Sequence, residues 1–382
     1  MPTRRRFLAA ASGGLLAART AIARAAGTIL PVYFYPPSHR YADGTTLGSA
    51  TVFDLAQITT AMQLPPWAAG VSFGLQWSTI SRGRGQVDFS IIDAALDYWG
   101  RRGKKVLLGI ATSALPSHIG SLSGPFDVGV PPWAMGQIAT YRHKTRVTGR
   151  ASGEPDADVD LPDWRDERFV QLSAELIRAM GRYDGHPTIE TWRMGFGPGG
   201  EDNGIVGPLN NPTWMPAYRE EQWVDYVRKI AAIYLTTFRR TRLEFDLGRL
   251  SGIARVSPPP VRAKVQAHLD QMRAGHVMLG FTGLSSGTID DVEDTTRPTH
   301  LLFAQMMDYQ ARGGSLCLEA YSPMFSPRMA NVPAMMQVIR RLRPERLVLF
   351  YDMAQDLSDR QHMANRQGTP AALAFADALT RG

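Results

Sequence analysis

The 382-residue chain has a single cysteine, Cys317, so no disulfide can form within one molecule. It also lacks C-x-x-C and H-E-x-x-H spacings, and we therefore expect no metal site. No Gly-rich phosphate loop follows the first apolar segment, where Tyr35-Pro36-Pro37-Ser38 stands instead. That absence argues against a dinucleotide-binding open sheet. Together these absences predict a protein that works without metal or cofactor.

No apolar run near the N-terminus is long enough to span a bilayer as a helix. What stands there is a twin-arginine pattern, Thr3-Arg4-Arg5-Arg6-Phe7-Leu8, followed by a short apolar run over residues 7–17. Small residues at 23–25 (Ala-Arg-Ala) are typical of a cleavage site. We therefore expect residues 1–26 to be a signal peptide and residues 27–382 to be one domain, periplasmic or secreted, without an integral membrane segment.

The basic character of the chain belongs largely to this leader. The formal net charge is +7 for the whole sequence, but residues 1–26 contain five arginines and no acidic residue. Residues 27–382 therefore keep 37 basic and 35 acidic residues, a net charge of +2. A nearly neutral domain gives no electrostatic reason to expect nucleic-acid binding.

Eight short apolar segments, rich in β-branched and aromatic residues, recur along the chain and alternate with stretches of helical periodicity. The expected strands are 29–35, 71–77, 105–111, 189–195, 243–247, 276–281, 315–319 and 347–351. The expected helices include 89–99, 167–181, 221–237, 261–273, 300–310, 332–342 and 370–380. This alternation predicts a single α/β domain, a (β/α)8 TIM barrel, with the open doubly wound sheet as the alternative.

Two connections are unusually long for a compact domain. Residues 117–166 follow the third expected strand and residues 196–216 follow the fourth, and both are rich in glycine and proline. Structureless loops of this length are typical of functional lids and walls. Loops that follow strands gather at the C-terminal mouth of a barrel, so both are expected beside a substrate cleft.

Two glutamates follow the pattern expected of catalytic carboxyl groups at that mouth. Glu201 lies just past the fourth strand, in a Gly-rich turn. On the seventh strand, alternation places Cys317 and Glu319 on one face and Leu316 and Leu318 on the other. The leucines suit the layer beneath the helices, so we expect Glu319 to point into the barrel.

Cleavage of a glycosidic bond requires two carboxyl groups that flank it, one acid and one nucleophile or base. The fourth and seventh strands lie across the mouth of an eight-stranded barrel from each other. This layout resembles the large clan of retaining glycosidases whose acid/base and nucleophile lie on those strands. The segments Gly70-Val71-Ser72-Phe73, Trp77 and Gly85-Gln86-Val87-Asp88-Phe89 are also similar to that clan. The resemblance implies that Glu201 is the general acid and Glu319 the nucleophile.

The sequence departs from that clan at the position before the acid, where Gly200 replaces the usual asparagine. The string Gly195-Phe196-Gly197-Pro198-Gly199-Gly200-Glu201 is more similar to the acid-bearing turn of β-amylases. The segment Leu316-Cys317-Leu318-Glu319 resembles the one that holds their base. β-Amylases invert configuration, so this second resemblance implies an inverting mechanism with Glu319 as the water-activating base.

Other residues near strand ends are candidates for binding a sugar. Aromatic rings stack on the C–H faces of sugars, and six are suitably placed: Tyr35, Trp77, Trp133, Trp192, Trp214 and Tyr321. Three further side chains could hydrogen-bond hydroxyl groups: Asp246, Arg249 and Asp352. Ordinary packing remains the alternative for the aromatic residues. Two other carboxylates, Glu190 and Asp202, also lie near strand ends.

The sequence thus predicts a glycoside hydrolase that cleaves an oligo- or polysaccharide without cofactor, through Glu201 and Glu319. The strand placement favours retention of configuration, whereas the turn that carries Glu201 favours inversion. A barrel that binds carbohydrate without cleaving it is the alternative from another functional class, with the two glutamates accepting hydrogen bonds from sugar hydroxyls.

Overall fold

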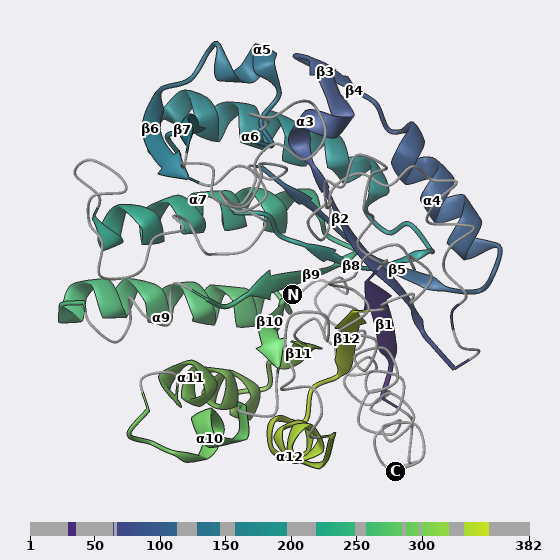
Figure 1. Ribbon diagram of the computed structural model, residues 1–382, viewed down its shortest axis with the longest axis vertical. Coiled ribbons are helices and arrows are strands. Elements are labelled where there is room, and N and C mark those ends of the chain that lie inside the picture. Colours follow the sequence, from purple (N-terminus) through teal and green to yellow (C-terminus); the bar gives the residue numbers. More distant parts are fainter. Residues whose placement is uncertain are drawn as a thin grey trace, which may run out of the picture.

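The structure of the protein is a computed structural model that shows a barrel with a surrounding layer of helices (Figure 1). It describes Leu64 and the ranges 30–35, 67–112, 128–145, 157–196, 219–248, 257–284, 288–297, 300–320 and 332–350. No helix among these residues is both long and apolar enough to cross a membrane.

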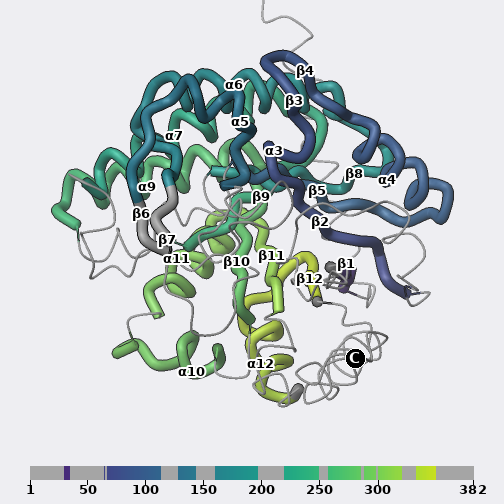
Figure 2. Tube along the Cα trace, turned by 45° about the horizontal axis from the view of Figure 1, so that its top comes forward, coloured from purple at the N-terminus to yellow at the C-terminus, as the bar shows by residue number. Residues whose placement is uncertain are grey.

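Eight parallel strands close into one barrel, in the order β1-β12-β11-β10-β9-β8-β5-β2. Their bounds in chain order are β1 Val32–Tyr35, β2 Gly70–Gln76, β5 Lys105–Ala111, β8 Ile189–Arg193, β9 Arg242–Asp246, β10 Met278–Leu284, β11 Ser315–Ala320 and β12 Arg346–Phe350. The ring closes where β1 pairs with β12, seen as purple beside yellow in Figures 1 and 2. The (β/α)8 barrel expected from the sequence is therefore confirmed.

Helices lie around the outside of this barrel (Figure 1). The longer ones are α4 Ser90–Gly100, α6 Glu167–Met180, α7 Glu220–Thr237, α9 Pro259–Ala274, α11 His300–Ala311 and α12 Val332–Leu342. Shorter elements are α3 Trp77–Ile80, α5 Pro132–Met135, α10 Thr288–Glu293, the 3-10 turn η2 Gly181–Tyr183, and the hairpin of β3 Ser81–Gly83 with β4 Gln86–Val87. The expected helix over residues 370–380 lies outside the described residues.

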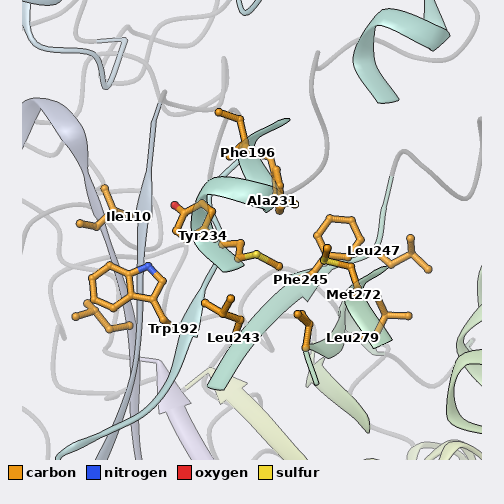
Figure 3. Close-up of a cluster of buried hydrophobic side chains, with 14 of the residues drawn as sticks. Ile110, Trp192, Phe196, Ala231, Tyr234, Leu243, Phe245, Leu247, Met272 and Leu279 are labelled. Atoms are coloured by element: carbon orange, nitrogen blue, oxygen red, sulfur yellow. The ribbon is translucent and has the colours of Figure 1, made fainter. Parts of the chain in front are cut away.

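Strand alternation divides the buried residues between two layers. On β2, Val71, Phe73 and Leu75 face outward and join the large apolar core between strands and helices. Figure 3 shows part of this core, where Trp192 and Phe245 of neighbouring strands lie near Tyr234 of α7. Inside the barrel a smaller cluster consists of Tyr33, Leu107, Met278, Cys317 and Val348. Interior side chains nearer the C-terminal ends of the strands are mostly polar, and they form the candidate site.

Part of the long segment after β5 is regular structure, which corrects the expectation of a structureless loop over residues 117–166. Within it, α5 is followed by an antiparallel ribbon of β6 Thr140–Thr145 and β7 Ala157–Pro162. The pairing runs from Thr140 opposite Pro162 to Thr145 opposite Ala157. The ribbon was missed because its strands carry mainly polar and charged residues, so they lack the apolar content that identifies a barrel strand.

One buried histidine gives the fold an expected sensitivity to acid. His268 of α9 is 0 % exposed, and neither ring nitrogen has a hydrogen-bond partner among the described residues. Its ring lies edge-on to Phe245, with ring centroids 5.2 Å apart. Burial, with a smaller contribution from the Arg228 charge, lowers the pKa of His268 from 6.5 to about 3. The folded protein therefore holds this imidazole neutral at pH values where the unfolded chain protonates it.

The free energy of unfolding should consequently fall as the pH drops from 6.5 toward 3, because only the unfolded state gains the proton. Between about pH 7.5 and pH 5, this residue should cost about 2 kcal/mol. Urea unfolding at both values should show that loss in the unchanged protein, and a smaller loss in His268→Leu. His276→Asn is the control, since it removes an exposed imidazole at a backbone φ of 54° that asparagine tolerates. Equal pH dependence in His268→Leu and the unchanged protein would contradict this interpretation.

Candidate active site

Glu319 points into the barrel near its C-terminal mouth, as the alternation on its strand predicts. It pairs with Thr282 of β10 on one side and Val348 of β12 on the other. Leu316 and Leu318 lie in the outer core, whereas Glu319 lies on the interior side and is 8 % exposed. A buried carboxylate needs a charged partner or a functional role, because burying the charge without a partner costs free energy.

The partner is Arg193, the last residue of β8. Its Nη2 donates to Glu319 Oε2 at 3.0 Å and lies 3.4 Å from Glu244 Oε1. Its Nε lies 3.2 Å from Asp246 Oδ2, an ion pair without hydrogen-bond geometry, and no other described group donates to that oxygen. One guanidinium from the fourth strand therefore joins carboxyl groups from the fifth and seventh.

A second arginine lies deeper in the barrel. Arg346, the first residue of β12, donates to Glu244 Oε2 and to the hydroxyl of Thr191, and its Nε lies 3.4 Å from the sulfur of Cys317. Arg346 is 3 % exposed and Glu244 is 1 % exposed. Burial lowers the pKa of Arg346 to about 9, which leaves the guanidinium charged at neutral pH.

Two guanidinium groups thus meet three carboxyl groups inside the barrel. A fully ionised set would carry one excess negative charge in a poorly solvated place, which is unfavourable. Burial raises the pKa of Asp246, and the charge of Arg193 only partly opposes that effect. Asp246 therefore gives up its proton less readily than an exposed aspartate does.

Two interior glycines make room for this network. A Cβ atom at Gly280 of β10 would lie 2.0 Å from Asp246 Oδ1 and 3.2 Å from Glu244 Oε1. One at Gly109 of β5 would lie 3.0 Å from the Cβ of Arg193. Any larger residue at Gly280 would push the acidic side chains of β9 out of place, so the network depends on residues that contribute no side chain.

Gln76, at the end of β2, is a polar residue that sequence reasoning did not select. It shares the interior face of its strand with Ser72, whose neighbour Leu107 lies in the inner cluster. The side chain is almost fully buried, and no described group donates to its Oε1. An unsatisfied amide oxygen at the mouth of a barrel is suited to accept a hydrogen bond from a ligand hydroxyl.

Three of the aromatic residues proposed to bind a sugar have described side chains: Trp77, Trp133 and Trp192. Trp77 is 1 % exposed and Trp192 is 0 % exposed, so neither offers a ring face to a sugar. Trp192 stacks on Phe238 with centroids 4.7 Å apart, and Trp77 meets Trp133 edge-on at 5.8 Å. Their role in the described structure is packing, because both side chains point into the core between strands and helices. Trp133 of α5 is half-buried.

Several expected site residues lie outside the described residues, and their assignments stay predictions. Glu201 is among them, together with Trp214, Arg249, Tyr321, Asp352 and the side chain of Tyr35. Asp246 is described, and it forms an ion pair with Arg193. Within the described part of the chain, no cluster of three His, Cys, Asp or Glu side chains is arranged to hold a metal ion.

A serine-hydrolase motif also occurs, at Gly283-Leu284-Ser285-Ser286-Gly287 (G-x-S-x-G), beginning in the last two residues of β10. The motif acts as a nucleophile elbow in the α/β-hydrolase sheet, on a sharp turn between strand and helix. Here the strand before it belongs to a closed barrel, so the fold does not provide that context. Ser285 itself lies outside the described residues.

Comparison with known proteins supports the fold. No protein-family model and no curated protein matches the chain. Among solved structures, the catalytic domain of a β-amylase from Paenibacillus polymyxa has a TM-score of 0.50 at 11% identity, covering 74% of this chain and 85% of that one. A β-galactosidase from the psychrophilic Marinomonas ef1 has a TM-score of 0.47 at 15% identity, covering 82% of this chain and 55% of that one.

A GH5_18 protein from Streptomyces cattleya, solved in complex with GlcNAc, has a TM-score of 0.46 at 16% identity, covering 86% of this chain and 73% of that one. At these identities a likeness concerns the fold alone, and the β-amylase domain, with its TM-score of 0.50, agrees with the barrel. Activity has to be argued from the site.

Proposed function

We propose that the protein is a glycoside hydrolase that cleaves O-glycosidic bonds of an oligo- or polysaccharide, with Glu201 as general acid and Glu319 as nucleophile or base. The observation that carries this proposal is the ion pair between Glu319 and Arg193 at the mouth of the barrel. The guanidinium stabilises the negative charge of Glu319, and a nucleophile or base must be charged to act.

One buried polar atom at the mouth of the barrel also suits a neutral, hydroxyl-rich substrate. No described group donates to Gln76 Oε1, and an amide oxygen accepts a hydrogen bond. A sugar hydroxyl would supply the missing donor.

A screen of chromogenic glycosides and common polysaccharides tests the proposal. We expect the unchanged protein to release product from at least one substrate, and Glu319→Gln to release almost none. Retained binding of the same sugar by both proteins, without cleavage by either, would contradict the proposal. That result would instead indicate a barrel that only binds carbohydrate.

The stereochemical outcome depends on the separation of the two carboxyl groups. About 5 Å leads to a covalent intermediate and retention, whereas about 6.5–9.5 Å leaves room for water and leads to inversion. We favour retention, because the pair is assigned to the fourth and seventh strands. NMR of the first anomer released by the active protein decides between the two mechanisms.

We also propose that the chain is exported by the twin-arginine route, on the strength of Arg4 and Arg5 before Phe7-Leu8. Replacing both arginines with lysine should leave an uncleaved precursor in the cytoplasm, which cell fractionation and immunoblotting detect. The control is Arg19→Lys, which changes an arginine of the same leader outside the motif. Normal export of the double-lysine variant would refute the route.

A further inference from the structure

Arg193 is the side chain through which the acidic residues of the site are connected. It contacts Glu319 of β11 and both Glu244 and Asp246 of β9, at distances between 3.0 and 3.4 Å. The residue follows Trp192, whose ring is locked in the core on the opposite face of the strand. The backbone that carries Arg193 is therefore held by packing, and its guanidinium by three acids.

The contacts use different nitrogens of the guanidinium. Nε faces Asp246, whereas Nη2 faces Glu319 and Glu244. Because the guanidinium is planar and rigid, fixing one of these contacts also fixes the direction of the others. A lysine ammonium is a single point charge on a flexible stem and cannot hold two carboxyl groups in a fixed relation.

We propose that Arg193 is a positioning residue for the reaction assigned above: it orients Glu319 and stabilises the charged form of that carboxyl group. The inference rests on the proposed function for its kinetic consequences, but the ion pairs themselves do not depend on it. Arg193 acts through Glu319 and need not touch the substrate.

The charged and titratable groups around Glu319 are few within the described residues. Its own strand contributes Cys317, and the neighbouring strand β10 contributes Gly280 and Thr282, which do not titrate. The other groups are Arg193 from β8, Glu244 and Asp246 from β9, and Arg346 from β12. Arg242, the first residue of β9, lies deeper in the barrel, where its charge acts on Cys317. Arg193 contacts the Glu319 carboxylate directly. Its removal should therefore shift the titration of Glu319.

The first test compares the kinetics of Arg193→Gln and Arg193→Lys with those of Arg242→Gln. Arg242 makes a comparable ion pair with Glu345, at 2.6 Å, at the opposite end of the barrel. Arg193→Gln should lower kcat by on the order of a hundredfold, since misplacing a reacting group has effects of that size. KM should stay within a few-fold. The acid limb of the kcat/KM profile should rise by about one pH unit.

The conservative variant makes the test independent of a simple folding defect. Arg193→Lys keeps the positive charge, so the acid limb should stay within a few tenths of a unit, while kcat falls because the fixed orientation is lost. Arg242→Gln should leave both the pH profile and kcat unchanged. Unaltered kcat and acid limb in both Arg193 variants would overturn the inference. So would equal shifts of the acid limb in Arg193→Gln and Arg242→Gln.

A second measurement does not need a substrate. Carboxyl ¹³C NMR of protein labelled at glutamate, with Glu319→Gln used to assign the signal, follows the titration of Glu319 directly. We expect its midpoint in Arg193→Lys to stay near that of the unchanged protein, and its midpoint in Arg193→Gln to rise by about one unit. An unmoved midpoint in a folded Arg193→Gln would overturn the inference. A moved midpoint in a protein that cleaves no glycoside would uphold the positioning and reject the proposed function.

Discussion

Glu319→Gln is expected to reduce kcat by about a thousandfold or more while leaving the fold and sugar binding largely intact. The amide has nearly the same shape but cannot attack an anomeric carbon or accept a proton from water. It also lacks the charge that pairs with Arg193. Glu201→Gln should have a similar effect on substrates with poor leaving groups, because these require protonation by the acid. Steady-state kinetics on the substrate found by screening measures both losses.

Glu293→Gln serves as the matched control, since Glu293 is an exposed glutamate of α10. Its variant should retain full activity. Near-normal turnover by both Glu319→Gln and Glu201→Gln would show that the carboxyl pair is assigned wrongly. The next residues to test would be Asp202, beside Glu201 in the sequence, and Glu190, an exposed residue of β8.

Arg346→Met should lower the free energy of unfolding by about 3–5 kcal/mol, the largest stability effect that we expect in this protein. Among the described residues, the substitution leaves Glu244, which is almost fully buried, with the 3.4 Å contact to Arg193 as its remaining ion pair. It also removes the donor to Thr191. An uncompensated buried charge is costly because the group has lost its hydration without gaining a partner. Urea unfolding at neutral pH measures the change.

Two comparisons distinguish the cost of leaving Glu244 unpaired from a nonspecific loss of stability. Arg142→Met removes an exposed ion pair with Asp160, whose side chains are 64% and 51% exposed, and should cost at most about 1 kcal/mol. The double variant Arg346→Met/Glu244→Gln should be more stable than the sum of its single changes predicts, since it removes the stranded charge. Additive single effects, or a loss no larger than that of Arg142→Met, would contradict the buried ion-pair account.

The barrel could be predicted because its signals are local. Each strand carries its own apolar segment, and Lys105–Ala111 was located to the residue. Alternation on Ser315–Ala320 was enough to place Glu319 inside and Leu316 and Leu318 outside. Such patterns depend on neighbours one or two residues away, so a single sequence contains them in full.

The charged network could not be predicted, because its members are distant in sequence. Arg193 and Glu319 are 126 residues apart, and their contact exists only once the barrel has closed. The pattern of Glu244 and Asp246 two residues apart on an apolar strand was a usable signal for interior carboxyl groups. For two candidate tryptophans, position in the sequence did not show which way the side chain points. Trp77 and Trp192 lie near strand ends in the sequence, but their large rings fill the space between strands and helices.

Azide rescue of Glu319→Ala tests the central claim most directly, because it asks whether a small nucleophile can replace this one carboxylate. The variant should be inactive alone, and millimolar azide should restore turnover and yield a glycosyl azide, since azide can occupy the space of the missing carboxylate. Glu293→Ala, with and without azide, should behave like the unchanged protein. Full activity of Glu319→Ala without azide would contradict the claim, as would a folded, sugar-binding Glu319→Ala that neither azide nor formate restores.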